Sequence, residues 1–395
     1  MTIELLDRDL ALPGSNAYHD QMELLLLPDE VKGYERGTNQ EADLLRLRET
    51  ADGADLNAMW REFNRVVAMN NADRSRLVQL LSYRVSNDVE RVYYPVSEDF
   101  EEASEFGEPK GVRLGRPFSM GFDFKWYDLA IRYTWKFLVD ATSEELRALT
   151  NEALEADNRL VFTRIMKAVF NPANRTAEIN GAAYNVYALY NGDGTVPPQY
   201  KTTTFDNTHT HYLASGAGTV DSGDLDDMEE HLFHHGYRMT NGYQLVLLAN
   251  RQEAQVIRGF TVAGGDAYDF IPNGNVGGGI LRDPKQIVGQ PGGSGIPGEI
   301  GTYGPFNVIE EEYIPAGYMV AFATGGEESL GNMIGIREHA NASVRGLQLV
   351  KGPDNDYPLT DSFYRHGLGT GIRHRGAGVV MKITAGAYAA PSQYA

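Results

Sequence analysis

The sequence contains no cysteine in its 395 residues. This absence excludes disulfide bonds, thiolate nucleophiles and zinc sites built from cysteine. A protein of this length without such cross-links must gain its durability from some other source.

Positive charge is scarce relative to negative charge. The chain has 35 Lys and Arg residues against 54 Asp and Glu residues, which leaves a formal net charge of −19. Such a surface repels nucleic acid at long range, so a general DNA- or RNA-binding role is not expected. A local basic patch is still compatible with this balance.

Long apolar runs are also missing. Met1–Leu10 lacks the charged-then-apolar pattern of a signal peptide, and Leu24–Leu27 is far too short to span a bilayer. We therefore expect a soluble protein made in the cytoplasm, with no membrane partner. The composition is otherwise that of a globular protein, with 42% hydrophobic and 23% charged residues and enough length for two or three domains.

The N-terminal part predicts an irregular arm followed by two helices. Residues 54–69 carry Leu56, Met59 and Phe63 at helical spacing. Asp73 is placed to cap a second helix that continues through Tyr83. These helices pack either on the body of the protein or on a neighbouring chain.

A strongly charged segment lies between two β-rich stretches. Val92–Val96 leads into it and Val112–Phe124 leads out of it. Because it has little apolar surface with which to fold on itself, it is either a solvated loop or a loop ordered by a partner of complementary charge. Its charged residues are Glu98, Asp99, Glu101, Glu102, Glu105, Glu108, Lys110, Arg113 and Arg116.

Two alternating apolar runs follow this segment, Met120–Trp126 and Leu129–Phe137. Both have the two-residue period of a strand, but their phases differ by one residue. Because such a slip moves side chains to the other face, the sequence predicts a bulge near Tyr127–Asp128.

A single long helix is predicted over residues 143–170. Thr142 and Glu145 form a T-x-x-E capping box at its start, and Asn171–Pro172 stops it. At 1.5 Å per residue this helix is about 42 Å long, which exceeds most helices of globular proteins.

The rest of the chain alternates strands, short helices and loops. Residues 259–305 are rich in glycine and proline, which predicts an exposed or interface loop set. Helices are expected at 224–235 and 252–258. A hairpin is expected between the strands 176–179 and 183–189, with Asn180–Gly181 at its turn. Further strands are expected at 243–249, 306–313, 318–323, 334–338 and 378–384.

Five histidines are the first candidates for a metal site: His209, His211, His231, His234 and His235. His231 and His235 lie one helical turn apart, which is a ligand spacing. No H-E-x-x-H arrangement accompanies them, and histidines at a helix end also offset the helix dipole without a metal. We therefore expect no metal here.

Other candidate sites fail on context. Gly293–Gly298 matches G-x-G-x-x-G, but Pro291 and Pro297 break the strand and helix that the dinucleotide-binding fingerprint requires. The carboxylates around Asp221–Asp227 lack the glycine and final glutamate of a calcium loop and suit a helix start. With no P-loop, nucleophile elbow or recognisable triad, no enzyme activity and no cofactor are expected.

Several motifs in combination resemble the major capsid proteins of tailed bacteriophages, which have the Hong Kong 97-type fold. The resemblance covers roughly residues 84–395. The segments that carry it are 101–110 (EEASEFGEPK), 120–128 (MGFDFKWYD), 132–135 (RYTW), 155–158 (EADN), 190–194 (YNGDG), 208–213 (THTHYL) and 363–375 (FYRHGLGTGIRHR).

The resemblance implies an α+β subunit with named parts. These are an N-terminal arm (1–83), an extended β-hairpin loop lying across an adjacent subunit (84–137), a peripheral domain with a spine helix (138–222), an axial domain whose loops meet at the five- and six-fold vertices (223–340) and return strands of the peripheral domain (341–395). Some family members join subunits through a Lys–Asn isopeptide bond. Lys110 lies near the loop tip here, but no motif identifies an Asn partner, so non-covalent interfaces are expected.

The resemblance also implies a function in assembly. The chain is expected to form pentamers and hexamers in an icosahedral head shell around double-stranded DNA, with scaffold, portal and decoration proteins as further partners and no sequence-specific DNA binding. The expected inter-subunit contacts of the loop are Glu98, Glu101, Glu102, Glu105, Glu108, Lys110, Arg113 and Arg116. The alternatives are an encapsulin-like protein nanocompartment, or a β-rich hydrolase or glycan-binding protein.

Overall fold

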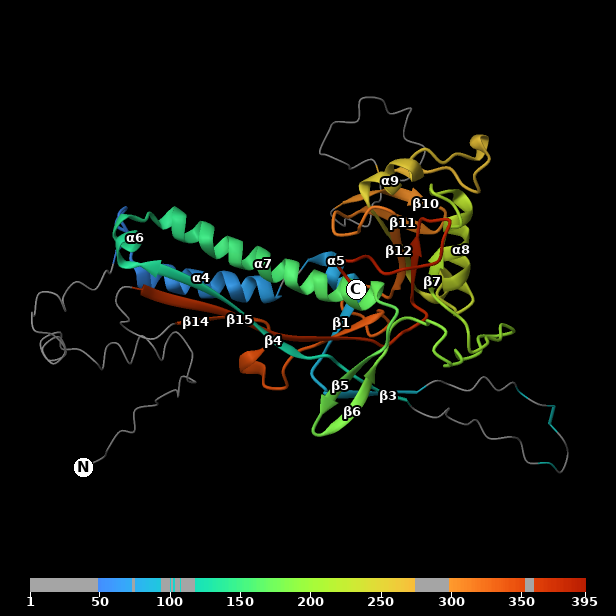
Figure 1. Cartoon of the computed structure of the whole chain (residues 1–395), viewed down its shortest axis with the longest axis horizontal. Coiled ribbons are helices and arrows are strands. Elements are labelled where there is room, and N and C mark those ends of the chain that lie inside the picture. Colours follow the sequence, from blue (N-terminus) through green and yellow to red (C-terminus); the bar gives the residue numbers. More distant parts are fainter. Residues whose placement is uncertain are drawn as a thin grey trace, which may run out of the picture. The chain divides into compact units, whose positions relative to one another are not determined.

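The computed structural model describes residues 49–72, 75–93, 100, 102–103, 107, 118–273, 298–351 and 359–395 (Figure 1). They form an α+β protein with several sheets, as the sequence predicted. Backbone contacts divide the chain into two units. The first contains the described residues up to Asn70 with those of Asp128–Leu154 and Gln348–Tyr364, and the second contains those of Asn71–Tyr127, Glu155–Leu347 and Arg365–Ala395.

A small apolar core holds the first unit together. Three helices contribute to it: α4 (Leu56–Ala72), α6 (Trp135–Asp140) and the first part of α7 (Ser143–Phe170). Met59, Leu138 and Leu146 meet there, each at most 8% exposed. The helical periodicity of residues 54–69 is thus confirmed, because its apolar side chains are the ones that the core buries.

The start of α7 is capped twice. Glu145 accepts a hydrogen bond from the Thr142 backbone N–H at 2.8 Å, and the Thr142 hydroxyl accepts one from the Glu145 N–H at 3.4 Å. Asp52 also accepts hydrogen bonds from the backbone N–H and the hydroxyl of Ser143, at 3.0 and 2.7 Å. The predicted capping box and the helix limits 143–170 are confirmed.

A seven-stranded sheet is the largest element of the second unit. Its order is β7 (Tyr212–Ala214), β16 (Gly378–Lys382), β12 (Tyr318–Thr324), β8 (Gln244–Ala249), β11 (Phe306–Glu310), β10 (Glu299–Tyr303) and β9 (Ile271–Pro272). The strands predicted near 243–249, 306–313, 318–323 and 378–384 are confirmed within these limits. β16 comes from the segment 341–395, yet it pairs with β12, a strand of the segment 223–340.

Both faces of this sheet are buried, and alternate residues of one strand serve different cores. In β8, Val246 and Leu248 join the cluster that contains the second half of α7. Leu245 and Leu247 join the opposite cluster, which contains α8 (Ser222–Phe233) and α9 (Arg251–Ile257). A continuous apolar run is therefore required here, because successive side chains point to opposite faces.

The glycine-rich region 259–305 was expected to be exposed loops, and this is wrong for its last part. β10 lies within it, and its Ile300 and Tyr303 are 6% and 2% exposed. The strand was missed because its apolar residues are few and a glycine, Gly301, interrupts them. Gly301 sits opposite the backbone of Ile271, where a Cβ would come within 2.3 Å of the carbonyl oxygen.

A four-stranded sheet frames the charged segment. Its order is β2 (Val89–Val92), β3 (Phe118–Gly121), β6 (Ala182–Val186) and β5 (Arg175–Ile179). β2 and β3 pair antiparallel, so the chain leaves and returns side by side, as predicted. The hairpin of β5 and β6 turns at Asn180 and Gly181 with φ of 52° and 77°, the left-handed values of a tight two-residue turn.

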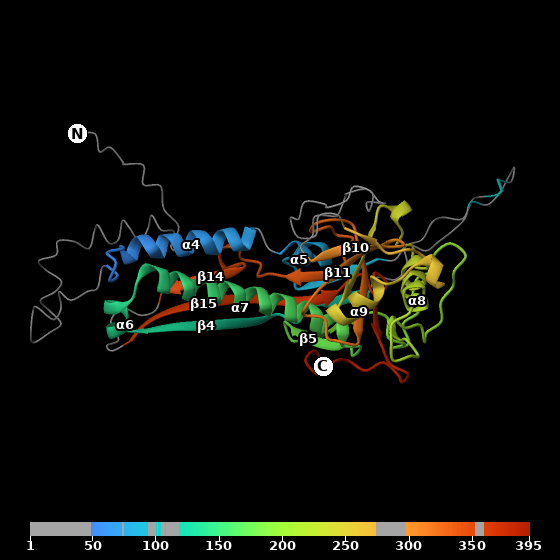
Figure 2. The same ribbon diagram turned by 90° about the horizontal axis from the view of Figure 1, so that it is seen from above.

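A five-stranded sheet contains three strands that the sequence did not predict. Its order is β1 (Ser82–Val85), β13 (Ile334–Arg337), β15 (Leu359–Ile372) and β14 (Leu347–Lys351). A fifth strand, β4 (Lys125–Thr134), also pairs with β15, and the two are labelled near each other in both ribbon views (Figures 1 and 2). The prediction of a helix through Tyr83 is wrong. α5 (Arg76–Leu81) ends before it, since Tyr83 is buried in a strand that pairs in parallel with β13.

Strand β15 was not predicted, because it contains several glycines and glycine lowers strand propensity. The structure shows why they stand there. A Cβ at Gly367 would come within 2.7 Å of the rings of Phe124 and Trp126, and one at Gly369 within 2.9 Å of the Phe124 backbone. The chain before β4 therefore packs directly on the backbone of β15.

The predicted bulge at Tyr127–Asp128 is wrong, because β4 runs through both residues. The break lies earlier, between β3 and β4, where the Asp123 carboxylate accepts a hydrogen bond from the Thr370 N–H at 2.8 Å. The strand expected to reach Phe137 ends at Thr134, whose hydroxyl caps α6 by accepting from the Phe137 N–H at 3.2 Å.

Asp224→Asn is expected to stabilise the protein at pH 8 by about 1 kcal/mol and to have no effect near pH 4. Asp224 is 4% exposed in the first turn of α8. Burial, with the charges of Asp221 and Asp227, raises its pKa to about 6. Because the folded state holds the proton more tightly, this contribution to stability is present below the unfolded pKa and is lost as the pH rises through 6.

The asparagine keeps the oxygen that accepts from the Asp221 N–H at 3.0 Å. The expected gain in stability at pH 8 is smaller than the free energy that corresponds to the full pKa shift of Asp224. The substitution also removes a negative charge, which a helix N-terminus favours. Denaturant unfolding at pH 4 and pH 8 measures the effect, with Asp140→Asn as a control for net charge. Equal gains at both pH values would contradict the prediction.

Candidate functional site

The loop charges expected to contact a neighbouring subunit lie mostly outside the described residues. These are Glu98, Glu101, Glu105, Glu108, Lys110, Arg113 and Arg116. Glu102 is described, and it is exposed. The glycine motif at Gly293–Gly298 also lies outside the described residues, except for Gly298.

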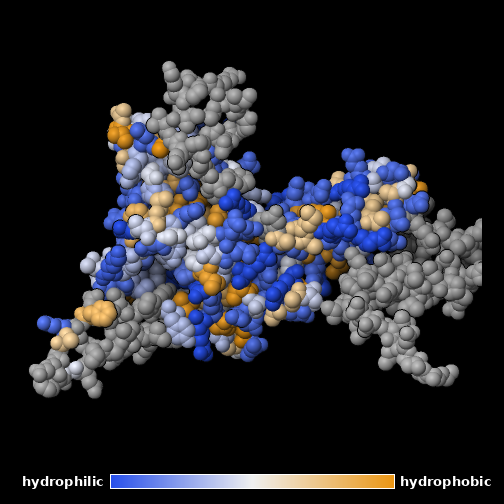
Figure 3. Space-filling view, turned by 180° about the vertical axis from the view of Figure 1, so that it is seen from behind, coloured by the Kyte–Doolittle hydropathy of each residue, from blue (hydrophilic) through white to orange (hydrophobic). Residues whose placement is uncertain are grey.

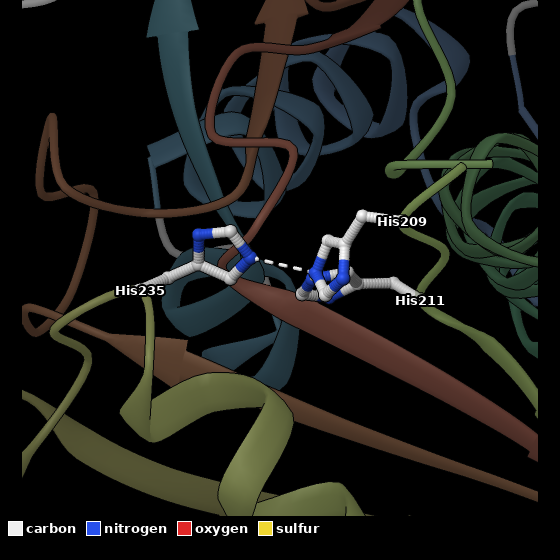
Figure 4. A group of neighbouring side chains, drawn as sticks. All are labelled: His209, His211 and His235. Atoms are coloured by element: carbon white, nitrogen blue, oxygen red, sulfur yellow. Dashed lines mark hydrogen bonds between the residues drawn. The ribbon is translucent and has the colours of Figure 1, made fainter. Parts of the chain in front are cut away.

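Three of the five candidate histidines come together, but they do not include the pair His231 and His235 that helical spacing suggested. The Nε2 atom of His209 lies 3.1 Å from that of His211 and 3.0 Å from that of His235 (Figure 4). His231, which was paired with His235 by helical spacing, instead turns its Nδ1 to the backbone oxygen of Asp227 at 2.8 Å. The T-H-T-H pattern was the available signal, since residues two apart in extended chain face the same side.

Backbone pairing places the two histidines of this pattern. The His211 N–H donates to the Tyr190 carbonyl at 2.7 Å, and the His211 carbonyl accepts from the Val380 N–H at 2.9 Å. His211 is therefore held between the segment before residue 191 and strand β16, with 0% of its surface exposed. His209 is tied nearby, where its carbonyl accepts from the Gly192 N–H at 3.0 Å.

The third histidine comes from the end of α8. His235 lies two residues after Phe233, the last residue of α8, and Gly236 with a φ of 87° lets the chain turn away. The His235 ring is stacked on Phe205, with centroids 4.3 Å apart and planes 5° from parallel, and lies at 5.4 Å and 16° from Tyr190. Aromatic contacts thus define the orientation of its ring.

The three imidazoles are held neutral. Burial, with the nearby His231 and His234, lowers the pKa of His209 to about 4. Burial and His209 lower the pKa of His235 to about 2, and burial holds the pKa of His211 well below its usual value. Neutral rings carry lone pairs, so this cluster (the histidine cluster: His209, His211 and His235) offers three ligand atoms within 4.8 Å of one another.

Two other features have structural explanations. The Asp221 and Asp224 carboxylates cap α8 reciprocally, which is the helix-start role expected for them. Arg375 is 2% exposed, and its guanidinium donates to the carbonyls of Ala188 and Leu189 and to the Asp193 carboxylate, at 2.8, 3.2 and 2.9 Å. Arg375 therefore ties the chain beside the histidine cluster to the loop before β16.

No described helix combines the length and the apolar character needed to cross a membrane. The described surface instead shows mostly hydrophilic residues on the face drawn in Figure 3, with apolar residues in separate patches.

Comparison with known proteins places the chain in a family. No protein-family profile and no curated protein matches it. Among solved structures, one from Mycobacterium phage Patience is 42% identical, with a TM-score of 0.66 over 88% of this chain and 94% of that chain. The mature capsid of bacteriophage PhiM1 is similar at 11% identity and a TM-score of 0.47, over 78% of this chain and 86% of that chain.

A structure of the holo-SrpI encapsulin complex from Synechococcus elongatus is 15% identical with a TM-score of 0.43, over 79% of this chain and 89% of that chain. The encapsulin and PhiM1 likenesses are too distant to carry an argument, whereas the Patience match covers nearly all of both chains. The chain belongs to the major capsid proteins of tailed bacteriophages, the structural subunits that form the head shell of the virion.

Proposed function

We propose that this chain assembles into an icosahedral shell that encloses the double-stranded DNA genome of a tailed phage, as a subunit of the Hong Kong 97 type. The 42% identity to the Patience structure over 88% of the chain is the observation that carries this proposal. The motifs of the sequence support it, because they match the family in combination along most of the chain.

The parts of such a subunit follow the elements of the fold. In this proposal α7 is the spine helix, residues 84–137 contain the extended loop, and the strands between residues 223 and 340 form the axial domain. The boundaries 1–83, 138–222 and 341–395 for the arm and the peripheral segments complete the division. The pairing of β16 with β12 adds residues 378–382 to the axial sheet.

Contacts between subunits are proposed for the charged loop. Glu98, Glu101, Glu102, Glu105 and Glu108 would meet basic residues of a neighbouring subunit, and Lys110, Arg113 and Arg116 would meet carboxylates. The charge pattern supports this, because complementary charge sets register and rejects wrong partners at an interface.

A strand edge provides a second contact surface. Within the described part of the chain, β4 pairs with β15, and seven of the ten residues of β4 are exposed, among them Trp126 at 50% and Leu129 at 42%. Long edge strands with exposed apolar residues invite further pairing. A neighbouring subunit that covers this edge would remove it from water.

An acidic shell suits a container for DNA. With a formal charge of −19 per chain, the wall attracts the genome weakly, so DNA can be packed and released. Scaffold, portal and decoration proteins are the partners that such a shell would require during assembly.

Electron microscopy of the purified full-length protein tests the proposal. We expect closed shells, filled with nuclease-protected DNA when they are isolated from phage-producing cells. Shells filled with protein cargo would favour the nanocompartment alternative, and a protein that forms no shell under any assembly condition would overturn the proposal. Monomer-sized bands after mature particles are boiled in detergent are expected, since nothing in the sequence identifies an isopeptide partner for Lys110.

A further inference from the structure

We propose that His209, His211 and His235 bind one divalent transition-metal ion of the kind that imidazole favours, with zinc as the ion tested below, and that this ion cross-links the end of α8 to the chain before β7. The proposal adds a site to the capsid subunit and does not depend on how subunits assemble. It replaces the expectation, drawn from spacing alone, that these histidines bind no metal.

The distances between the ligand atoms fit a metal. A zinc ion bound to nitrogen at about 2.0–2.1 Å in a tetrahedron places its ligands about 3.3–3.4 Å apart. The Nε2 atom of His209 is 3.1 Å from that of His211 and 3.0 Å from that of His235. All three ligand atoms lie within 4.8 Å of one another, so small rotations of the rings would admit the ion.

Hydrogen bonding alone does not explain this convergence. The Nε2 atom of a neutral imidazole carries either one proton or one lone pair. Since His209 makes both short contacts through that single atom, one proton cannot be directed along both of them. A cation between three lone pairs satisfies all three rings at once.

The tautomer of His211 is set for this role. Its Nδ1 lies 2.7 Å from the carbonyl oxygen of Gly378, which accepts hydrogen bonds and donates none. Nδ1 must therefore carry the proton, and Nε2 presents its lone pair to the other two histidines. A backbone carbonyl on the far nitrogen is the usual way in which proteins orient a metal-binding histidine.

The other rings are also oriented before any ion arrives. Phe205 and Tyr190 stack on His235, and Phe205 lies 4.9 Å from the ring of His209. Because burial keeps the three imidazoles neutral, as described above, binding requires no proton to leave them at neutral pH. Three imidazole ligands favour zinc, copper or nickel over calcium or magnesium, which prefer oxygen.

The cross-link would compensate for the lack of cysteine. Residues 209 and 235 lie on different elements, and His211 is hydrogen-bonded to β16. An ion at this point ties a loop, a helix end and a strand of the seven-stranded sheet together, as a disulfide does elsewhere. The burial of His211, with 0% exposure, favours a structural role over a catalytic one.

Metal analysis of untagged, full-length protein tests the proposal. After dialysis against metal-free buffer, wild-type protein supplied with zinc is expected to retain about one zinc ion per subunit. His209→Gln and His235→Gln are expected to weaken zinc binding by more than about 100-fold, because loss of outer-shell partners alone costs 10- to 100-fold. His339→Gln, which removes a half-buried histidine elsewhere in the second unit, should retain zinc.

Thermal unfolding gives an independent readout. A chelator is expected to lower the midpoint of wild-type protein by several degrees, restored by added zinc, and to leave His209→Gln unchanged. Cobalt added to metal-free wild-type protein should give the visible absorption of a tetrahedral site, which keeps the test valid if the variants do not fold. Wild-type protein that retains no zinc and shows no such cobalt spectrum, or variants that bind zinc as tightly as His339→Gln, would overturn the proposal.

Discussion

Replacing Arg375 by methionine is expected to destabilise the folded subunit by about 3–5 kcal/mol, the usual cost of removing one partner of a buried ion pair. Arg375 is 2% exposed, and its Nη2 atom lies 2.9 Å from the Asp193 carboxylate. The substitution leaves that carboxylate without its cation. It also leaves the carbonyls of Ala188 and Leu189 without the donors that now lie 2.8 and 3.2 Å away.

The contact with Arg375 also affects the pKa of Asp193. Burial raises the pKa of this carboxyl, but hydrogen bonds from Asn174, the Thr195 N–H and Arg375 outweigh burial and lower the pKa to about 2. Methionine fills much of the volume between the rings of Tyr187 and Tyr190, whose centroids lie 5.0 and 4.7 Å from the guanidinium carbon. The expected loss therefore comes from charge and hydrogen bonding rather than from a cavity.

Denaturant unfolding of the purified subunit measures this effect. Arg258→Met is the matched control, because Arg258 pairs with Glu310 at 3.0 Å while its own side chain is 43% exposed. Exposed pairs contribute about 0–1 kcal/mol, so the control should unfold close to wild type. If both variants lost the same small amount, Arg375 would not have the anchoring role assigned to it.

Reversing two charges of the loop, with Arg113→Glu and Arg116→Glu together, is expected to reduce the yield of closed shells by on the order of tenfold or more while the subunit still folds. Like charges placed against each other at an interface cost several kcal/mol. The loss is multiplied in a shell, because every subunit repeats the contact. The prediction rests on the charge pattern of the sequence, since both arginines lie outside the described residues.

Negative-stain microscopy and sedimentation measure the shell yield, and circular dichroism with thermal unfolding measures folding. The matched control is Arg113→Lys with Arg116→Lys, which keeps the charge and should assemble. Normal shell yields from the reversed variant would show that these arginines make no essential contact. An unfolded reversed variant would instead place them in the fold of the subunit.

Local signals were sufficient for much of the secondary structure. Helix α7 has its capping residues and its stop signal within a few positions of its ends, and both limits are where the sequence predicted them. The Asn180–Gly181 hairpin follows from backbone conformation that these two residues adopt readily. Strand β8 is recognisable because six successive residues contain no charge and are almost all apolar.

Elements that depend on distant partners were missed. Strand β15 contains glycines, which lower strand propensity. They are needed because Phe124 and Trp126 occupy the space that a side chain at Gly367 would fill. Tyr83 was assigned to a helix, but parallel pairing with β13 and a hydrogen bond to Glu90 at 2.7 Å hold it in a strand. In both cases contacts between residues far apart in sequence outweighed the local preference.

The family and the long helix were thus determined by the sequence itself, because motifs and capping residues are local and survive without coordinates. The histidine cluster was decided only by the tertiary structure. Spacing favoured His231 with His235, since both were expected on one helix face. The fold instead turns His231 toward the Asp227 backbone and brings His209 and His211 to His235, because pairing with Tyr190 and β16 places the T-H-T-H segment at the end of α8.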